Sequence, residues 1–274
     1  TKMTRNKKNI ILTLLIFLSI NSYAKEVNRI ISLAPSITNM IYLLEAQNKL
    51  VGCTNYCLEG VKDGKNIVGN AIDVNVEKVF LLKPDIVFTA GLTKPSTIEA
   101  LKKLNINVLT FPSAKTYTEI CEQFITIACY TGREQLAKKI VEYQKRRLDS
   151  IKKSIPKGEK PKIFIELGAK PLFTAVPNTF MDDFIAQAGG INIATDISTG
   201  IITRENVILK DPDAIVIVTM GIVGEEEKAV WKRYKQLSAA RKGKIFTVDP
   251  YKSCGPNPVT FVDVVEELVT KLYK

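Results

Sequence analysis

Short hydrophobic runs separated by amphipathic stretches predict strands that alternate with helices along the chain. Runs rich in Val, Ile and Phe at 30–33, 85–89 and 213–219 are typical of parallel strands buried on both faces. Strands that alternate with helices indicate an α/β fold built of parallel βαβ units. Apolar residues at the helical spacing of i, i+3, i+4 and i+7 predict longer helices over 36–46, 95–104, 117–130, 179–188, 229–237 and 258–273.

The longest predicted helix lies near the middle of the chain, from Thr131 to Pro156. Thr131 and Glu134 have the spacing of a capping box, and Pro156 ends the helical pattern. A helix of about 24 residues, at about 1.5 Å per residue, is about 36 Å long and exceeds an ordinary domain helix. Its apolar face is expected to hold Leu136, Ile140, Tyr143, Leu148, Ile151 and Ile155.

One pattern occurs on both sides of this helix. Residues 77–85 and 205–213 both read E-x-V-x-L-x-x-P-D, 128 residues apart. In each copy a residue typical of helix N-caps, Asn75 or Thr203, stands two positions before the glutamate. Capping and strand-opening preferences explain these residues singly, but not the recurrence of the whole pattern. We therefore interpret the chain as two Rossmann-like α/β lobes, joined by one long interdomain helix, with a ligand cleft between them.

The chain divides into four expected segments. They are a signal peptide at 1–24, an N-terminal lobe at 25–130, a linking helix at 131–157 and a C-terminal lobe at 158–274. The first segment has a basic start, an apolar run of 11 residues and a small residue, Ala24, before the expected cleavage. That run is too short to cross a bilayer, which takes about 20 residues. Because Lys25 and not cysteine follows, we expect a mature periplasmic chain without lipid anchor or membrane insertion. A long surface helix on a single domain is the alternative interpretation of 131–157.

The chain has a formal net charge of +11 and contains no histidine. Loss of the signal peptide, with Lys2, Arg5, Lys7 and Lys8, lowers the charge to +7. The remaining basic residues are spread out and lack the interleaved aromatic residues of nucleic-acid grooves, so we expect no nucleic-acid partner. At most two disulfides can form, and the sequence leaves their pairing open among Cys53, Cys57, Cys121, Cys129 and Cys254.

No catalytic constellation is recognisable. Without histidine, Ser-His-Asp and Cys-His mechanisms and most catalytic zinc sites are unavailable. No G-x-G-x-x-G motif follows a strand, and the segment 60–66 is one residue short of a P-loop. Cys53 and Cys57 have no second ligand pair at zinc spacing, and the carboxylates at 182–183 and 225–227 are expected on solvated surface. We predict a binding protein rather than an enzyme, with no cofactor, no metal site and a functional cleft.

The chain resembles the periplasmic substrate-binding proteins of ABC importers over essentially all of its expected mature length. The resemblance is carried by RIISLAPSITNMIYLLEA, VGCTNYC, GNAIDVNVEKVFLLKPDIV, the long helix and TRENVILKDPDAIV. More specifically, the chain resembles the class with a helical backbone, whose members carry vitamin B12, haem and ferric siderophores. The resemblance implies a monomeric protein that captures an iron chelate, either ferric siderophore or haem, or cobalamin. Its partners would be an ABC permease and the ATPase of that permease.

Two glutamates of the repeated pattern match the docking residues of this family. In the helical-backbone class one glutamate on each lobe docks into arginine pockets of the permease, and Glu77 and Glu205 stand at those positions. Two like charges on similar lobes suit two similar basic patches, and they contribute orientation and encounter rate more than affinity.

The loops that follow the strands are expected to line the cleft. They are 34–36, 55–57, 70–73, 89–94, 168–173, 199–202, 219–221 and 249–256. Tyr56 resembles a tyrosine that packs on the ligand in the B12-binding branch, because an exposed ring suits a flat chelate. A ring folded back on its own lobe is the alternative. Lys94, Lys170 and Lys252 would meet acidic groups of a charged chelate. The candidate ligand-binding residues are Ser36, Asn55, Tyr56, Asn70, Lys94, Lys170, Phe173 and Tyr251.

Several positions differ from the sequence pattern of the family, and these differences leave the identity of the bound chelate open. The segment after Tyr56 reads Cys-Leu-Glu-Gly in place of the usual Asp-Tyr-Pro, and the cleft tryptophan of the B12 branch is absent from 69–73. The single tryptophan is Trp231, on a predicted helix. The lack of histidine excludes His-ligated haem, whereas Tyr56 or Tyr251 would be able to hold haem iron. The alternatives are an exported two-domain metal-dependent enzyme and a non-transport binding module on the same fold.

Overall fold

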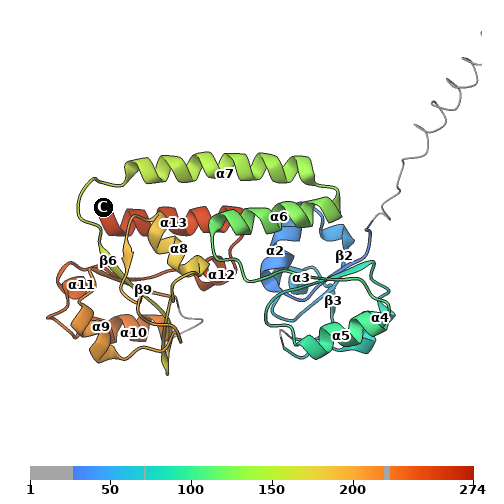
Figure 1. Ribbon diagram of the computed structural model, residues 1–274, viewed down its shortest axis with the longest axis horizontal. Coiled ribbons are helices and arrows are strands. Elements are labelled where there is room, and N and C mark those ends of the chain that lie inside the picture. Colours follow the sequence, from blue (N-terminus) through green and yellow to red (C-terminus); the bar gives the residue numbers. More distant parts are fainter. Residues whose placement is uncertain (1–26, 71, 219–222) are drawn as a thin grey trace, which may run out of the picture.

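The computed structural model describes residues 27–70, 72–218 and 223–274. The expected signal peptide at 1–24 and the expected cleft loop at 219–221 lie outside these residues. Two α/β lobes lie side by side beneath one long helix (Figure 1). Within the described ranges, no helix is long and apolar enough to span a membrane.

The N-terminal lobe is a parallel sheet with helices on both faces. Its strand order is β3-β2-β1-β4-β5. Successive residues of β1 and β4 enter hydrophobic clusters on opposite sides of the sheet, which explains their continuous apolar sequence. The strands are β1 (Ile30–Ser32), β2 (Leu50–Cys53), β3 (Asn66–Ile67), β4 (Ile86–Thr89) and β5 (Val108–Thr110). The helices are α2 (Pro35–Leu43), η1 (Gln47–Lys49, a 3-10 turn), α3 (Leu58–Lys62), α4 (Val76–Leu81), α5 (Pro95–Lys103) and α6 (Tyr117–Thr131).

The C-terminal lobe repeats this arrangement around one central strand. The strands are β6 (Lys162–Ala169), β7 (Leu172–Thr174), β8 (Ile191–Asn192), β9 (Ala214–Ile217) and β10 (Ile245–Thr247). β6 pairs in parallel with β8 and β9, and β10 extends the sheet from β9. β7 departs from the first lobe because it folds back antiparallel to β6. The helices are α8 (Phe180–Gln187), α9 (Arg204–Lys210), α10 (Val223–Lys232), α11 (Ser238–Arg241), α12 (Pro250–Ser253) and α13 (Pro258–Tyr273).

The repeated sequence pattern forms the same helix–strand connection in both lobes. Asn75 and Thr203 cap α4 and α9 as predicted, because each side-chain oxygen accepts a hydrogen bond from a backbone N–H three residues later. The valines of the two copies, Val79 and Val207, are completely buried. The prediction of two similar α/β lobes is therefore confirmed.

A basic side chain at the edge of each central strand holds the end of each repeated helix. Arg29 Nη2 donates to Leu82 O (2.7 Å), and Lys162 Nζ donates to Lys210 O (3.0 Å). These carbonyls lie at the C-terminal ends of α4 and α9, where a helix leaves acceptors unpaired. The two repeated segments are thus fixed to their sheets by matching contacts.

The linking helix α7 (Glu134–Ser154) contacts α6 of the first lobe and α13 of the second (Figure 1). The predicted start at Thr131 is wrong. Thr131 ends α6, and its hydroxyl donates back to Ile127 O. Gly132 then adopts a left-handed φ of 69°, and Arg133 begins α7 without a side-chain cap. The Thr131/Glu134 spacing therefore marks a tight corner between two helices.

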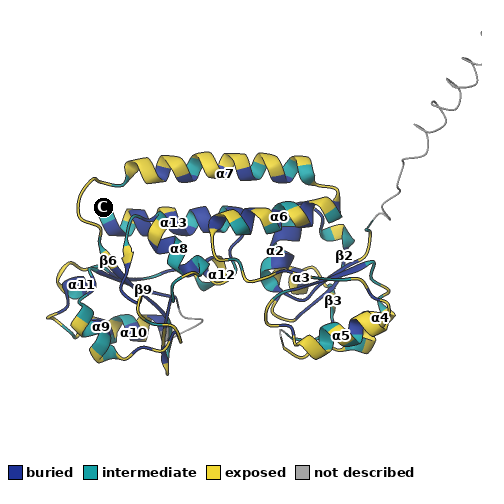
Figure 2. Ribbon diagram, viewed as in Figure 1, coloured by how far each residue is buried: buried dark blue, intermediate teal, exposed yellow. Residues whose placement is uncertain are grey.

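The buried face of α7 differs in part from the predicted apolar face. Leu148 and Ile151 are buried as expected, whereas Tyr143 points away from the protein and is 59% exposed. The buried positions repeat alternately every four and three residues and include small and polar side chains, namely Ala137, Val141, Gln144, Leu148 and Ile151. The other side of α7 is solvent-exposed along its length (Figure 2). Large apolar residues alone do not define this stripe. Because α7 packs closely against α6 and α13, a small residue such as Ala137 is also buried there.

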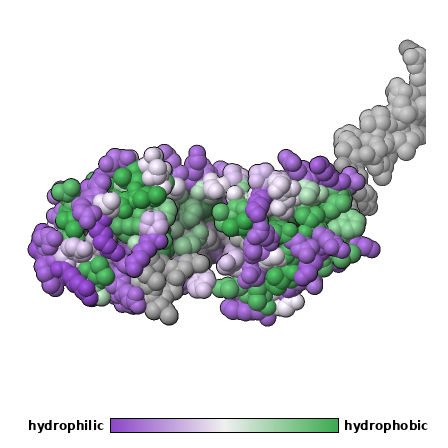
Figure 3. All heavy atoms as spheres, turned by 90° about the horizontal axis from the view of Figure 1, so that it is seen from below, coloured by the Kyte–Doolittle hydropathy of each residue, from purple (hydrophilic) through white to green (hydrophobic). Residues whose placement is uncertain are grey.

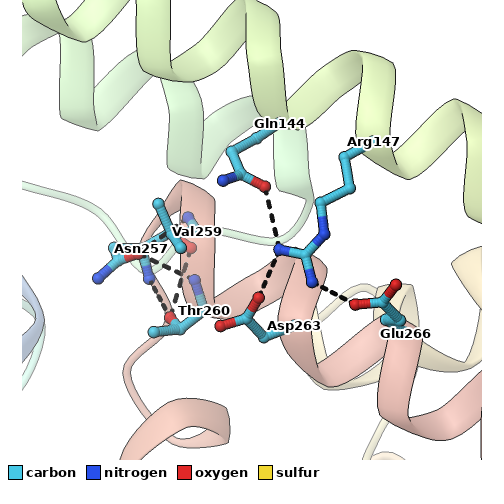
Figure 4. A network of polar contacts seen from close by, with 7 residues as sticks. All are labelled: Gln144, Arg147, Asn257, Val259, Thr260, Asp263 and Glu266. Atoms are coloured by element: carbon cyan, nitrogen blue, oxygen red, sulfur yellow. Dashed lines mark hydrogen bonds and ion pairs between the residues drawn. The ribbon is translucent and has the colours of Figure 1, made fainter.

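Arg147 ties α7 to the C-terminal helix α13 (Figure 4). Its guanidinium donates to Asp263 (Nη1–Oδ1, 2.5 Å) and to Glu266. One helical turn away from this contact, Asn257 and Thr260 form a capping box at the start of α13. The ion pair therefore fixes the linking helix to a helix whose own N-terminus is fully capped.

Replacing Arg147 by methionine should lower the free energy of unfolding by about 1 kcal/mol, because the partly buried Asp263 and the exposed Glu266 both lose a charged donor. Arg146→Met is the matched control, since Arg146 is exposed on the next position of the same helix. Urea unfolding measures both values. Equal losses in the two variants would show that the Arg147 contacts do not stabilise the fold.

Of the carboxylates expected on solvated surface, Glu225 and Glu226 are exposed as predicted. Asp183 is half-buried and Glu227 is buried, so for these two the prediction is wrong. Asp183 of α8 accepts a hydrogen bond from Tyr117 N (2.7 Å) at the start of α6, and so joins the two lobes. Glu227 is buried and forms an ion pair with Arg204. α10 also begins at Val223 and ends at Lys232, so its predicted bounds of 229–237 lie too far along the chain.

Candidate ligand cleft

The carboxyl ends of the parallel strands lead into loops around a hollow between the lobes. Figure 3 shows this hollow on the face of the molecule away from α7. Ser36, at the start of α2, lies against Gly255, which follows α12: a Cβ on Gly255 would be 3.5 Å from Ser36 Cβ. Ser36 therefore contacts the opposite lobe where the strand-end loops of the two lobes meet.

Large apolar side chains are exposed on the segments that follow the strands in both lobes. In the first lobe they follow β2, β3 and β4, and in the second they follow β6, β8 and β10. Phe173 and Ile201 lie opposite each other in an antiparallel bridge. Clustered exposed apolar side chains mark binding surfaces. We call this set the apolar rim: Tyr56, Ile72, Leu92, Phe173, Ile201 and Tyr251.

The loop that carries Tyr56 is anchored by the two flanking cysteines. Cys53 and Cys57 are completely buried free thiols, and Thr54 Oγ1 lies 3.2 Å from Cys57 Sγ. Hydrogen bonds from Cys53, and then from Thr38 and Thr54, lower the pKa of Cys57 to about 6. Tyr56 itself is 54% exposed, with Asn55 also exposed beside it, so the ring is not folded back on its lobe.

Asn70 shapes its loop. Its Oδ1 accepts hydrogen bonds from Ile72 N (2.8 Å) and Asp73 N (2.7 Å). Gly69 is required at this turn, since its φ is 143° and an added Cβ would lie 2.2 Å from Asp73 O. The turn therefore presents Ile72 to solvent within the predicted cleft loop 70–73.

The predicted lysines differ in their surroundings. Lys94 forms an ion pair with Asp73 (2.6 Å), and Lys170 is exposed at the turn between β6 and β7. Lys252 lines a pocket of about 420 Å³ together with Arg147 and acidic side chains of α13. A second pocket, of about 370 Å³, lies between α6, α7 and α8 and is also lined by charged residues. Both pockets border α7, so neither is the hollow between the strand ends.

A buried polar cluster lies beneath the rim of the second lobe. Glu166 of β6 is completely buried, and its Oε2 accepts a hydrogen bond from Trp231 Nε1 (2.6 Å). The guanidinium of Arg204 lies over the Trp231 ring at 4.6 Å and pairs with Glu227. Burial raises the pKa of Glu166 to about 7. Trp231 is therefore a core residue of this lobe and does not stand in for the missing cleft tryptophan.

Glu166→Gln should flatten the dependence of stability on pH. In the folded chain the Glu166 pKa is about 7, above the ordinary carboxyl value near 4.3, so the folded state favours the protonated form. The stability contributed by this proton is present below pH 4 and is lost as pH rises to about 7. At pH 8 the variant should be about 3 kcal/mol more stable than the wild type, with the difference vanishing near pH 4. Urea unfolding at both pH values tests this, with exposed Glu226→Gln as control, and a pH-independent difference would contradict it.

The predicted docking glutamates lie outside the rim. Glu77 and Glu205 are both exposed in the first turn of their helices, α4 and α9. They occupy equivalent positions on the two lobes, as the repeated pattern predicts. The described residues contain no cluster of three or more His, Cys, Asp or Glu side chains arranged to hold a metal ion.

Comparison with known proteins finds relatives over nearly the whole chain. Residues 30–252 match the family described as periplasmic binding protein. An uncharacterised ABC transporter substrate-binding lipoprotein of Bacillus subtilis is 34% identical over 263 residues, which cover 91% of this chain and 81% of that protein. The vitamin B12-binding protein of Vibrio cholerae is 26% identical over 254 residues, covering 89% and 88% of the two chains.

Solved structures show the same architecture. A possible iron-binding (periplasmic solute-binding) protein of Staphylococcus epidermidis has a TM-score of 0.77 at 28% identity, and the match covers 91% of this chain and all of that one. The crystal structure of the periplasmic vitamin B12-binding protein of Vibrio cholerae has a TM-score of 0.78 at 24% identity, covering 90% and 97%. At 24% identity, the match to the Vibrio cholerae structure supports the fold alone.

Proposed function

The chain belongs to the family of periplasmic binding proteins, as a substrate-binding protein of an ABC transporter, and we propose that it captures cobalamin between its lobes. The matched family consists of binding proteins, so the chain is not the exported enzyme considered as an alternative. The observation that carries the ligand proposal is the apolar rim, with aromatic side chains at Tyr56, Phe173 and Tyr251.

The chemistry of the rim favours a large, flat and largely neutral chelate. Exposed aromatic rings gain free energy by stacking on a flat macrocycle and by removing its apolar surface from water. Lys94 pairs with Asp73, and Lys252 lines a pocket together with acidic residues of α13, so these two lysines offer an anionic siderophore little net positive charge. The relationship to a vitamin B12-binding protein over most of the chain supports the same class of ligand.

Iron chelates are the second candidate. A solved relative at 28% identity is titled a possible iron-binding protein. The phenol groups of Tyr56 and Tyr251 are exposed on opposite lobes, and tyrosine is an established axial ligand of haem iron. In that case one phenolate would hold the metal, whereas cobalamin would use the rings only for packing.

The bound chelate would then be delivered to a permease in the membrane. We infer that Glu77 and Glu205 dock the loaded protein onto an ABC permease, and that a monomeric mature chain beginning near Lys25 acts in the periplasm. The Bacillus subtilis relative is a lipoprotein, so a lipid-anchored form is the alternative. The N-terminal mass of the mature protein distinguishes the two, because a lipid anchor adds acyl chains.

Titration separates the candidate ligands. Purified protein is titrated with cyanocobalamin, haemin and a ferric siderophore, and binding is followed by calorimetry and absorbance. We expect a one-to-one complex that is tightest with cyanocobalamin. Tighter binding of haemin, with an iron–phenolate absorption band, would favour the second candidate. Lack of saturable binding to all three would contradict the proposed chelate-binding function.

A further inference from the structure

Two exposed leucines occupy equivalent positions on the two lobes, next to the docking glutamates. Leu81 is 67% exposed and Leu209 is 84% exposed, and they lie 128 residues apart at the same place in the repeated pattern. A single exposed leucine is ordinary on a protein surface, but here the same exposed leucine occurs at the same position of both lobes. Their recurrence on both lobes indicates that one kind of partner contacts both.

Helix geometry places each leucine beside its glutamate. Glu77 and Leu81, like Glu205 and Leu209, are four residues apart and therefore share one helix face. The opposite face of each helix is fixed by a completely buried valine, Val79 or Val207. We call the four outward residues the paired Glu–Leu surface: Glu77, Leu81, Glu205 and Leu209.

Both helices are held rigidly, so this surface is preorganised for a partner. Each has an N-cap side chain, and each has its C-terminal carbonyls bonded by a basic side chain, Arg29 or Lys162. The residue before the proline of each repeated pattern adopts a left-handed φ, 46° at Lys83 and 41° at Asp211. The two halves thus present the same side chains on the same local backbone.

We propose that Leu81 and Leu209 are contact residues for the membrane permease, each inserting into an apolar hollow beside the basic group that receives the neighbouring glutamate. The inference rests on the proposed function. It adds an apolar contact with the permease to the charged contacts of the two glutamates. A partner for this surface must carry two equivalent sites, which a permease built of two like halves provides. A carboxylate beside a leucine requires a basic group beside an apolar hollow.

The test measures association of the protein, in the presence of saturating cyanocobalamin, with the purified permease–ATPase complex in lipid nanodiscs. Leu81→Ser and Leu209→Ser should each weaken binding about tenfold, and the double variant about a hundredfold, because each removes one buried leucine contact. Ligand affinity and urea stability should stay at wild-type values. Leu81→Met with Leu209→Met should retain binding, since methionine fills an apolar hollow of similar size.

Tyr143→Ser is the control, because it removes an exposed large side chain, 59% accessible, from α7 and should not change permease binding. Raising salt to about 0.5 M should reduce the contribution of the glutamates to permease affinity, because salt screens charges. The contribution of the leucines should stay unchanged. Unchanged permease binding by the double serine variant, or an effect confined to one lobe, would overturn this inference and leave the proposed function standing. Failure of the wild type to bind the permease at all would contradict the proposed function itself.

Discussion

Replacing both Glu77 and Glu205 by alanine should abolish uptake of the chelate while its affinity for the purified protein stays unchanged. Both side chains are exposed on helices outside the rim, so their removal leaves the ligand contacts intact. Paired charges at equivalent positions orient the protein on a two-part partner and speed the encounter. Uptake of labelled ligand by cells, together with titration of the purified variant, measures the two effects separately.

A control for this result is Glu122→Ala with Glu142→Ala, which removes the same charge from exposed positions on α6 and α7. These helices lie on the opposite side of the lobes from α4 and α9 (Figure 1). The control should transport normally. Normal transport by the Glu77/Glu205 variant would show that neither glutamate takes part in docking.

Replacing Tyr56 and Phe173 by alanine should weaken ligand binding about a hundredfold. Each ring loses its stacking and its apolar burial against the ligand, about 1.4 kcal/mol or a factor of ten apiece. Because the two residues belong to different lobes, the effects should add if the ligand bridges the cleft. Calorimetric titration with cyanocobalamin or haemin measures the loss.

Tyr143→Ala is the matched control, since Tyr143 and Tyr56 are 59% and 54% exposed. Its ligand affinity should equal that of the wild type, and all variants should unfold within about 0.5 kcal/mol of the wild type, as expected for surface substitutions. A Tyr56/Phe173 variant with full affinity would place the ligand outside the rim.

The parts of the fold that depend on local periodicity were predictable from the sequence. α13 has its predicted bounds, Pro258 to Tyr273, because an N-capping residue precedes an unbroken apolar stripe. The repeated pattern likewise located α4 and α9 with their caps, since a capping side chain and the helix it begins are neighbours in sequence. Local signals of this kind need no knowledge of tertiary packing.

The errors arise where distant segments meet. Asp183 lies within a carboxylate pair that is ordinarily solvated, yet the start of α6 supplies its hydrogen-bond donor. Glu227 is buried because Arg204 pairs with it and stacks on Trp231. Thr131 was assigned to the wrong helix because α6 turns directly into α7 at Gly132. No spacing rule reveals such partners, which lie up to 66 residues away, as for Tyr117 and Asp183.

The candidate site was predictable in outline only. Tyr56, Phe173 and Tyr251 are exposed on strand-end segments, where the order of strands and loops places them. Ile72, Leu92 and Ile201 lie in loops predicted to line the cleft, but the sequence does not single them out, because a single apolar residue in a loop does not reveal whether it is buried. The ligand roles of all rim residues remain predictions, as do those of Ser36, Asn55, Asn70, Lys94 and Lys170.

Native mass spectrometry of the protein purified from its own host tests the central claim most directly, because a captured chelate adds its mass to the chain. We predict a one-to-one complex with a corrinoid, or with haem for the second candidate, that is lost from the Tyr56→Ala, Phe173→Ala variant and kept by Tyr143→Ala. A wild-type protein that carries no chelate and acquires none from added cyanocobalamin or haemin would contradict the account.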